Sequence, residues 1–344
     1  MDLLQINTGH ISYCSGYAES RIGGRSENQD YFGYAETSRG FIITVCDGMG
    51  GGPSGRTAST IAVNEILTGF SEANDDEETT NVIIKAIRRA NLAIIEAGNE
   101  KPSLKGMGST ATVLLISEHS AIAAHVGDSR IYQIRGKKKI FRTFDHSMVF
   151  DLVREKVITE EQARLSAQSN IITRALGIYP DVQVDIKELS YEKGDRFILC
   201  TDGIHGTMPE KELVKMFSSR KAALGAVTDD IATFVDDLGR TEGGGHDNLT
   251  IAILETKKNS KLRPKMSNQT KLTLIILTAV CIISLAANIF LANRTIATPR
   301  HSESFDSLKA ELDKKDSADK DSIKKLNDSI ISLRKRLSTE QKND

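Results

Sequence analysis

The feature that most constrains the fold is the order of the short β-rich runs, because they come in neighbouring pairs instead of alternating one by one with helices. Such runs predict strands at 11–17, 41–46, 110–117, 120–126, 130–134, 182–189, 196–201 and 248–254. Helical spacing of apolar residues predicts helices at 54–70, 80–97, 147–154, 159–167, 209–217 and 220–239. Paired strands favour an α+β fold of antiparallel sheets covered by helices, and they disfavour a doubly wound parallel sheet.

Residues 272–293 form an uncharged segment that departs from this soluble pattern. As a helix the segment would be about 33 Å long, which is enough to cross a hydrocarbon core of about 30 Å. A buried core helix is the alternative, but the segment is apolar on all sides and follows the last domain-like pattern. We therefore expect one transmembrane helix here.

Basic residues flank this segment unequally. Six lysines and arginines lie between 257 and 271, whereas Arg294 and Arg300 alone follow closely. The positive-inside rule then places residues 1–271 in the cytoplasm and residues 294–344 outside the cell membrane. The basic cluster is also expected to attract anionic headgroups.

The chain is accordingly expected to have four parts. Residues 1–256 would be the catalytic domain, 257–271 a basic juxtamembrane linker, 272–293 the span and 294–344 an extracytoplasmic tail. The tail contains two short blocks with heptad-like spacing of apolar residues. They are compatible with a solvated or partly disordered helix and equally with a short coiled coil through which two chains would self-associate.

Composition narrows the possible functions. The net charge of −1 gives no general attraction to nucleic acid. The cysteines at 14, 46, 200 and 281 are too scattered for a Cys-x-x-Cys metal site, and the first three are expected to be reduced. The N-terminus lacks the basic start and apolar core of a cleavable signal peptide.

Five aspartates lie at expected strand ends beside glycines or turn residues: Asp30, Asp47, Asp128, Asp202 and Asp247. Mg²⁺ and Mn²⁺ prefer oxygen ligands, strand ends hold carboxylates rigidly, and glycines allow carbonyl groups and waters to approach an ion. One Asp-Gly pair alone would indicate a hairpin turn. Five in this order indicate a site for divalent cations.

The segments around these aspartates carry a family resemblance. "GGRSENQD", "VCDGMGG", "GMGSTATVLL", "AHVGDSRIY", "DHS", "TRALG", "LCTDGIHG" and "HDNLTIAIL" follow one another between about residues 11 and 256. In this order they resemble the signature motifs of the metal-dependent Ser/Thr protein phosphatases (PPM, or type 2C phosphatases), in their bacterial form. The resemblance implies an αββα sandwich, in which two antiparallel sheets are flanked by helices.

The resemblance also implies a site for two Mn²⁺ or Mg²⁺ ions at one end of the sandwich. Asp47 would bridge the two ions and the carbonyl of Gly48 would bind one of them. Asp202 and Asp247 would bind the other. Asp128 matches a residue that helps to hold a third, weakly bound ion in bacterial members.

Two further residues would complete the catalytic machinery. Arg25 matches the family's phosphate-binding arginine, and a guanidinium suits bidentate contact with phosphate oxygens; a surface salt bridge is the alternative. Asp30 would hold metal-bound waters. Two cations about 3.5–4 Å apart would activate a water for direct attack on phosphorus. No covalent nucleophile is then required, and Cys46 and Cys200 are expected to be core residues.

The sequence departs from the family pattern at two positions. Gln29 stands where many members have Glu, which removes an acidic contact to the metal site. Met49 stands where some members have His, a candidate general acid. His146 and His246 lie near motifs, and both are expected to be structural.

The expected function is the hydrolysis of phosphoserine and phosphothreonine in proteins, opposing a Ser/Thr kinase in signalling. One alternative is an inactive phosphatase-like module that binds phosphoproteins or relays a signal. Another is a phosphatase for small phosphorylated metabolites, because substrate choice depends on loops such as 143–180 that the motifs do not constrain.

Overall fold

The computed structural model describes residues 4–6, 13–50 and 53–262, with short pieces of chain between 280 and 332. By its internal contacts the chain divides into a first unit, Met1–Lys265, and a second unit, Met266–Asp344. The backbone N–H of Lys257 donates to the carbonyl of Tyr13 at 2.7 Å, and that of Leu262 donates to His119 at 2.7 Å. The folded part of the first unit therefore continues to residue 262, past the expected boundary at 256.

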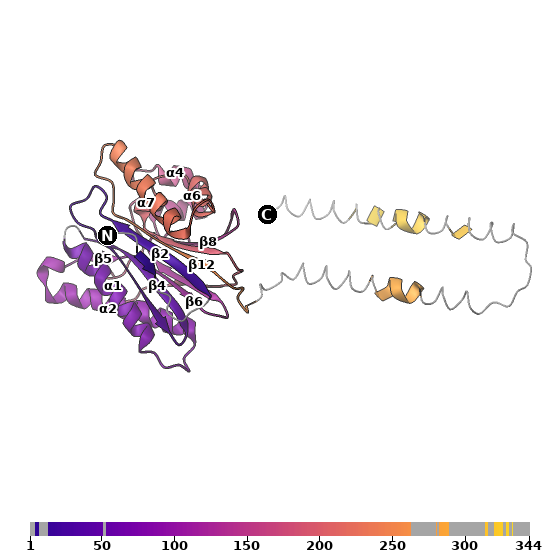
Figure 1. The fold of residues 1–344 in the computed structure, drawn as a ribbon, viewed down its shortest axis with the longest axis horizontal. Helices are drawn as coiled ribbons and strands as arrows, with labels where there is room; N and C mark the ends of the chain where they lie inside the picture. The colour runs from indigo at the N-terminus through magenta and orange to yellow at the C-terminus, as the bar shows by residue number, and fades with distance from the viewer. Residues whose placement is uncertain are drawn as a thin grey trace, which may run out of the picture. The chain divides into compact units, whose positions relative to one another are not determined.

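Two antiparallel sheets form the centre of the first unit, as the paired strands predict (Figure 1). One sheet has the order β1 (Leu4–Ile6), β2 (Cys14–Arg21), β12 (Leu249–Thr256), β11 (Arg196–Cys200), β8 (Arg130–Arg135) and β9 (Lys138–Arg142). The other has the order β10 (Asp185–Leu189), β7 (Ala121–Val126), β6 (Ala111–Ile116), β4 (Gly40–Met49) and β3 (Asp30–Thr37), with β5 (Gly108–Ser109) paired to the end of β4.

Helices cover the outer face of each sheet (Figure 1). The helices are α1 (Pro53–Ser71), α2 (Thr79–Glu100), α3 (Met148–Arg154), α4 (Glu160–Arg164), α5 (Asp202–His205), α6 (Glu210–Phe217) and α7 (Leu224–Thr241), with a 3₁₀ turn at Pro102–Leu104. α1 and α2 pack on the β4 sheet, whereas α6 and α7 pack on the β11 sheet. α3 and α4 surround a small core of their own, which includes Phe150 and Ala163.

The strand β4 shows why the central strands read as continuous apolar runs. Phe41 and Ile43 belong to the core between the two sheets, whereas Ile42 and Cys46 belong to the core beneath α1 and α2. Both faces of the strand are buried, so both sets of alternating side chains must be apolar. The buried ladder in turn fixes the position of Asp47 near its end.

The structure differs from the sequence expectation in the extent of several elements. β4 continues to Met49, so Asp47 lies inside the strand instead of ending it. The strand expected at 11–17 begins among residues that the structure does not describe, and its described part runs on to Arg21. The expected strands did not include β1, β5 or β9, and of β3 only its start at Asp30 was expected. The edge strand β9 is largely exposed and so lacks the apolar signature of a buried strand.

Among the described residues, no helix is long and apolar enough to cross a membrane. The expected span 272–293 lies outside these residues except at Val280 and 282–288, which are helical and exposed. The two heptad-like blocks of the tail also lie largely outside them.

Candidate active site

Asp30 and Asp47 are directly opposite each other in the antiparallel β3–β4 ladder. Asp47 is fixed by Thr110, whose hydroxyl accepts from the Asp47 N–H at 2.9 Å and whose own N–H donates to the Asp47 carbonyl at 2.8 Å. The hydroxyl of Thr201 donates to Oδ2 of Asp30 at 2.9 Å. Backbone pairing and two threonines therefore hold this pair of carboxylates in place.

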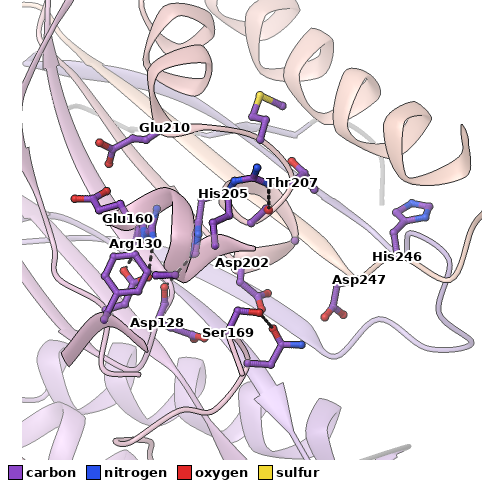
Figure 2. A pocket seen from close by; sticks show the side chains of 18 of the residues that line it. Asp128, Arg130, Glu160, Ser169, Asp202, His205, Thr207, Glu210, His246 and Asp247 are labelled. Carbon is purple, nitrogen blue, oxygen red and sulfur yellow. Dashed lines mark hydrogen bonds and ion pairs between the residues drawn. The ribbon is translucent and has the colours of Figure 1, made fainter. Parts of the chain in front are cut away.

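Three more aspartates reach the same end of the sandwich from other connections. Asp128 lies between β7 and β8, Asp202 is the first residue of α5, and Asp247 precedes β12. Their side chains line one cavity of about 380 Å³ (Figure 2). The structure thus brings together the carboxylates that the sequence singles out.

Burial and mutual repulsion raise the pKa values of these carboxyl groups. Burial, more than the neighbouring charges, raises the pKa of Asp30 to about 7 and that of Asp202 to about 6. The pKa values of Asp47 and Asp128 are raised well above the usual range, again mainly by burial and then by neighbouring aspartates. Neighbouring positive charges therefore do not compensate the negative charges of these carboxylates.

Several carboxylate oxygens at the site also lack a hydrogen-bond partner. Oδ1 of Asp30, of Asp128 and of Asp202 is buried without one. Buried carboxylate oxygens are costly unless a hydrogen bond or a cation compensates them. Oxygen-rich, negatively charged pockets suit Mg²⁺ and Mn²⁺, so the residues present fit the divalent cations that the sequence predicts.

Gly48 is required by the close approach of α1 to β4. A Cβ atom added at Gly48 would lie 1.9 Å from the carbonyl oxygen of Gly55, in the first turns of α1. Gly50 has φ = 138°, a conformation that L residues rarely adopt. The glycines after Asp47 therefore allow the helix to pack against the strand next to the carboxylates.

Arg25 contacts the acidic cluster directly. Its Nη2 donates to Oδ2 of Asp247 at 2.9 Å, and the two side chains are 51% and 37% exposed. An exposed ion pair of this kind contributes little to stability. Arg25 thus has an unburied guanidinium at the rim of the cavity, free to exchange partners.

Asn248 helps to position Arg25. It is not among the functional residues predicted from the sequence. Its side-chain Nδ2 donates to the carbonyls of Ile22 and Glu27, at 2.8 and 2.9 Å, and its Oδ1 accepts from the N–H of Gln29 at 2.8 Å. One amide thus ties the β2–β3 connection to the start of β12. Its place beside Asp247 in "HDNL" was the available signal.

Two buried arginines shape the side of the cavity nearest α3 and α4. Arg130 forms a bidentate pair with Asp145, with N–O distances of 2.7 and 2.6 Å. Arg142 contacts Glu160 of α4 and Glu210 of α6, both at 2.6 Å. These contacts hold the 143–170 segment over the cavity, which Ser169 and Asn170 of that segment also line.

His125, His146 and Asp185 form a second cluster, with ligand atoms within 4.8 Å of one another. Nδ1 of His146 accepts the N–H of Gly127 at 3.1 Å, which leaves the ring proton on Nε2. Arg174 Nη1 lies 2.8 Å from Asp185 Oδ1 and 3.0 Å from His146 Nε2. Arg174 therefore supplies a positive charge to this cluster, and the N–H of Gly127 takes up the Nδ1 lone pair of His146.

The remaining expected structural residues are accounted for by their contacts. His246 lies at the border of the cavity (Figure 2), and its Nε2 lies 2.8 Å from Asp236 Oδ1 of α7. Cys46 and Cys200 are buried, and burial raises the pKa of the Cys46 thiol to about 12 and that of Cys200 further. Both thiols stay protonated and are unsuited to nucleophilic attack.

Comparison with known proteins places this fold and site in a family. The sequence profile of the family described as protein phosphatase 2C matches residues 18–261. A serine/threonine phosphatase stp of Listeria innocua is 31% identical over 243 residues, covering 70% of this chain and 94% of the relative. The protein phosphatase PhpP of Streptococcus pneumoniae is 32% identical over 233 residues, covering 67% and 92%.

Solved structures agree with the sequence comparisons. The S. agalactiae serine/threonine phosphatase has a TM-score of 0.65 and 30% identity, covering 71% of this chain and all of that chain. The catalytic domain of the serine threonine protein phosphatase PstP, solved in complex with 2 manganese ions, has a TM-score of 0.59 and 27% identity, covering 72% and 99%. The chain belongs to the protein phosphatase 2C family and is a metal-dependent serine/threonine phosphatase.

Proposed function

We propose that Asp47, Asp202 and Asp247, with the carbonyl of Gly48, hold two Mn²⁺ or Mg²⁺ ions, and that Asp128 contributes to a weaker third site. The observation that carries this proposal is the cavity lined by Asp128, Asp202 and Asp247, in which Oδ1 of Asp128 and of Asp202 is buried without a hydrogen-bond partner. Besides burial, the charges of these three groups also raise the pKa of Asp47, which places Asp47 beside them. Bound divalent cations supply the charge that activates a water and stabilises the oxygens of an in-line displacement at phosphorus.

The chain's own residues then divide the remaining work. Arg25, at the rim, donates to two phosphate oxygens after leaving Asp247. Thr201 occupies one oxygen of Asp30 and leaves Oδ1 to accept a proton from a water. The 143–170 segment, held by Arg142, limits the approach of solvent and contacts the peptide around the phosphorylated residue.

We infer that the physiological substrates are phosphoserine and phosphothreonine in proteins. The test is hydrolysis by residues 1–262 of matched phosphoserine, phosphothreonine and phosphotyrosine peptides and of small sugar and nucleotide phosphates, each with Mn²⁺. We expect turnover of the first two peptides. Preference for the small phosphates would favour a metabolite phosphatase, and binding of phosphopeptides without turnover would favour the inactive module.

We also propose that residues 272–293 anchor the enzyme in the cell membrane, with the phosphatase domain and basic linker inside and the tail outside. Support comes from the uncharged run and from the excess of basic residues before it. In the full chain, a Cys placed at Ser338 should react with an impermeant maleimide in intact cells, and one placed at Ser260 should not. The reverse pattern contradicts this topology.

The same architecture suggests a regulatory setting. A membrane-anchored phosphatase fits opposition to a membrane Ser/Thr kinase, and the heptad-like blocks of the tail would allow two chains to pair. Pairing is tested by the mass of the detergent-solubilised full chain compared with a chain ending at residue 300. Equal, monomeric masses contradict pairing through the tail.

A further inference from the structure

The end of the first unit that lies opposite the acidic cavity is formed by strand connections. β8 begins two residues after Asp128, and Asp202 lies two residues after the end of β11. The other ends of these antiparallel strands therefore point away from the cavity. At that far end Arg135 Nη1 contacts Glu192 at 2.6 Å. The β8–β9 connection and the β10–β11 connection therefore lie side by side.

Exposed basic residues gather on these connections. Lys137 lies on the β8–β9 connection, Lys138 is the first residue of β9, and Lys193 lies on the β10–β11 connection. The backbone N–H of Lys193 donates to Oδ1 of Asn259 at 2.7 Å, and that of Gly194 donates to Thr256 at 2.8 Å. These bonds bring Lys193 next to exposed Lys257, which directly follows β12.

The α6–α7 connection adds two more cations to the same area. Arg220 hydrogen bonds to the carbonyl of Gly194, so it and exposed Lys221 lie beside Lys193. Lys137, Arg220 and Lys221 also line a cavity of about 1120 Å³ that runs along α6 and the start of α7. We call these six residues the basic face: Lys137, Lys138, Lys193, Arg220, Lys221 and Lys257.

Two acidic side chains near the basic face already have partners, whereas exposed Asp230 lines the same cavity as Lys137, Arg220 and Lys221. Glu192 pairs with Arg135, and Glu255 pairs with Arg196 at 2.9 Å and with Arg220. Among the ion pairs of the described residues, none involves the five lysines of the basic face. Their charges are thus available to an external anion.

We propose that the basic face docks on the anionic surface of a lipid bilayer. The described part of the unit ends at Leu262, which is bonded to His119 of the β6–β7 connection at the same far end. From there the sequence continues through further basic residues into the uncharged run 272–293. Lipid-facing charge on the folded unit would add to that of the linker. Docking in this way turns the acidic cavity, at the opposite end, away from the bilayer and toward soluble substrates.

An acidic loop lies at the same end of the unit as the basic face and bounds the area that can approach an anionic bilayer. The α1–α2 connection carries Asp75, Asp76 and Glu77, and Ser38 of the β3–β4 connection donates to Asp75 at 2.7 Å. This loop lies at the same far end but on the helices of the other sheet. Repulsion there favours a tilted orientation in which the β8–β9 and β10–β11 connections approach the bilayer first.

Vesicle binding by residues 1–262 tests the proposal without the expected span. This fragment matches a complete solved phosphatase chain, so it folds by itself. We expect it to sediment with phosphatidylcholine vesicles that contain phosphatidylglycerol and not with vesicles of pure phosphatidylcholine. Added salt should release the bound fragment from the anionic vesicles. Failure to bind anionic vesicles at low salt overturns the proposal while leaving the phosphatase assignment intact.

Matched charge reversals separate the basic face from net charge. Lys137→Glu/Lys193→Glu/Lys221→Glu should weaken vesicle binding roughly tenfold or more. The control Arg88→Glu/Lys101→Glu/Lys105→Glu changes net charge equally and should keep most of the binding.

Phosphopeptide turnover by both triple variants reports that they are folded. Equal loss of vesicle binding in the two contradicts the proposal. So does binding of the parent fragment to polyglutamate but not to vesicles, which would identify an acidic protein segment as the partner.

Discussion

Asp30 and Asp47 face each other across the β3–β4 ladder, with Asp30 buried and Asp47 half-buried. Burial and the repulsion between the two carboxylates raise both pKa values. The ladder register cannot relieve the repulsion, because the buried core on both sides of β4 fixes the strand. The repulsion therefore favours the binding of cations at this end of the sandwich.

Replacing Asp47 by Asn should separate metal binding from folding. Without divalent cations the variant should be at least as stable to heat as the parent, because one source of repulsion is gone. With Mn²⁺ the parent should gain thermal stability that the variant lacks, and variant turnover should fall by orders of magnitude. Thermal melts with and without Mn²⁺ measure this, with exposed Asp151→Asn as the control. Equal stabilisation of parent and Asp47→Asn by Mn²⁺ is the contradicting result.

Arg25→Ala should weaken binding of phosphopeptides and inhibition by inorganic phosphate. A charge-assisted hydrogen bond contributes about 1.5–3 kcal/mol, so losing one corresponds to roughly 10- to 150-fold. Arg25→Lys keeps the charge but not the planar guanidinium. Its affinity for phosphopeptides and phosphate should therefore lie between those of the parent and Arg25→Ala. Mn²⁺ affinity, measured by calorimetry, should not change. A normal KM together with altered Mn²⁺ affinity would show that Arg25 serves the metals instead.

Removing one charge from the buried pair Arg130–Asp145 should destabilise the protein far more than removing one from a surface pair. Asp145→Asn leaves the guanidinium of Arg130 buried beside a neutral partner, and we expect a loss of about 3–5 kcal/mol in the free energy of unfolding. Glu161→Gln, which breaks the exposed pair with Arg164, should change the free energy of unfolding much less. Urea denaturation compares the two. Similar small losses would show that the buried pair is compensated by water.

The sequence predicts much of this architecture because burial leaves a periodic trace. The central strands, the long helices and the five aspartates were predictable, since β4 is apolar on both faces and glycines mark the turns beside the carboxylates. The edge strand β9 left no such trace, because its side chains are mostly exposed.

Contacts between distant segments were not predictable from one sequence. Asn248 donates to the carbonyls of Ile22 and Glu27, which lie 226 and 221 residues earlier in the sequence. Arg174 contacts His146, which lies 28 residues earlier. Side-chain spacing reports local structure, whereas such pairings depend on how the sheets stack. The roles of the individual metal ligands remain predictions, with the geometry compatible with them.

His146 should make stability depend on pH. Burial, assisted by His125 and Arg174, lowers the pKa of His146 from 6.5 to about 4. The unfolded ring binds a proton as the pH falls below 6.5, and the folded ring does so only near 4, so the free energy of unfolding decreases across this window. The loss is about 3 kcal/mol.

The variant His146→Gln isolates this effect. The amide can still accept the N–H of Gly127 but does not titrate. Urea denaturation between about pH 7 and pH 4.5 should therefore give a flatter curve for His146→Gln than for the parent. Parallel curves would mean that the ring binds protons equally in the folded and unfolded protein, which contradicts a lowered pKa.

The most direct test of the metal-dependent site is phosphothreonine hydrolysis by residues 1–262 after removal of divalent cations with EDTA. The account predicts no measurable turnover until Mn²⁺ or Mg²⁺ is added back, and a loss of orders of magnitude in Asp202→Asn at the Mn²⁺ concentration that saturates the parent. Undiminished turnover in EDTA, or full activity of Asp202→Asn, would contradict the account.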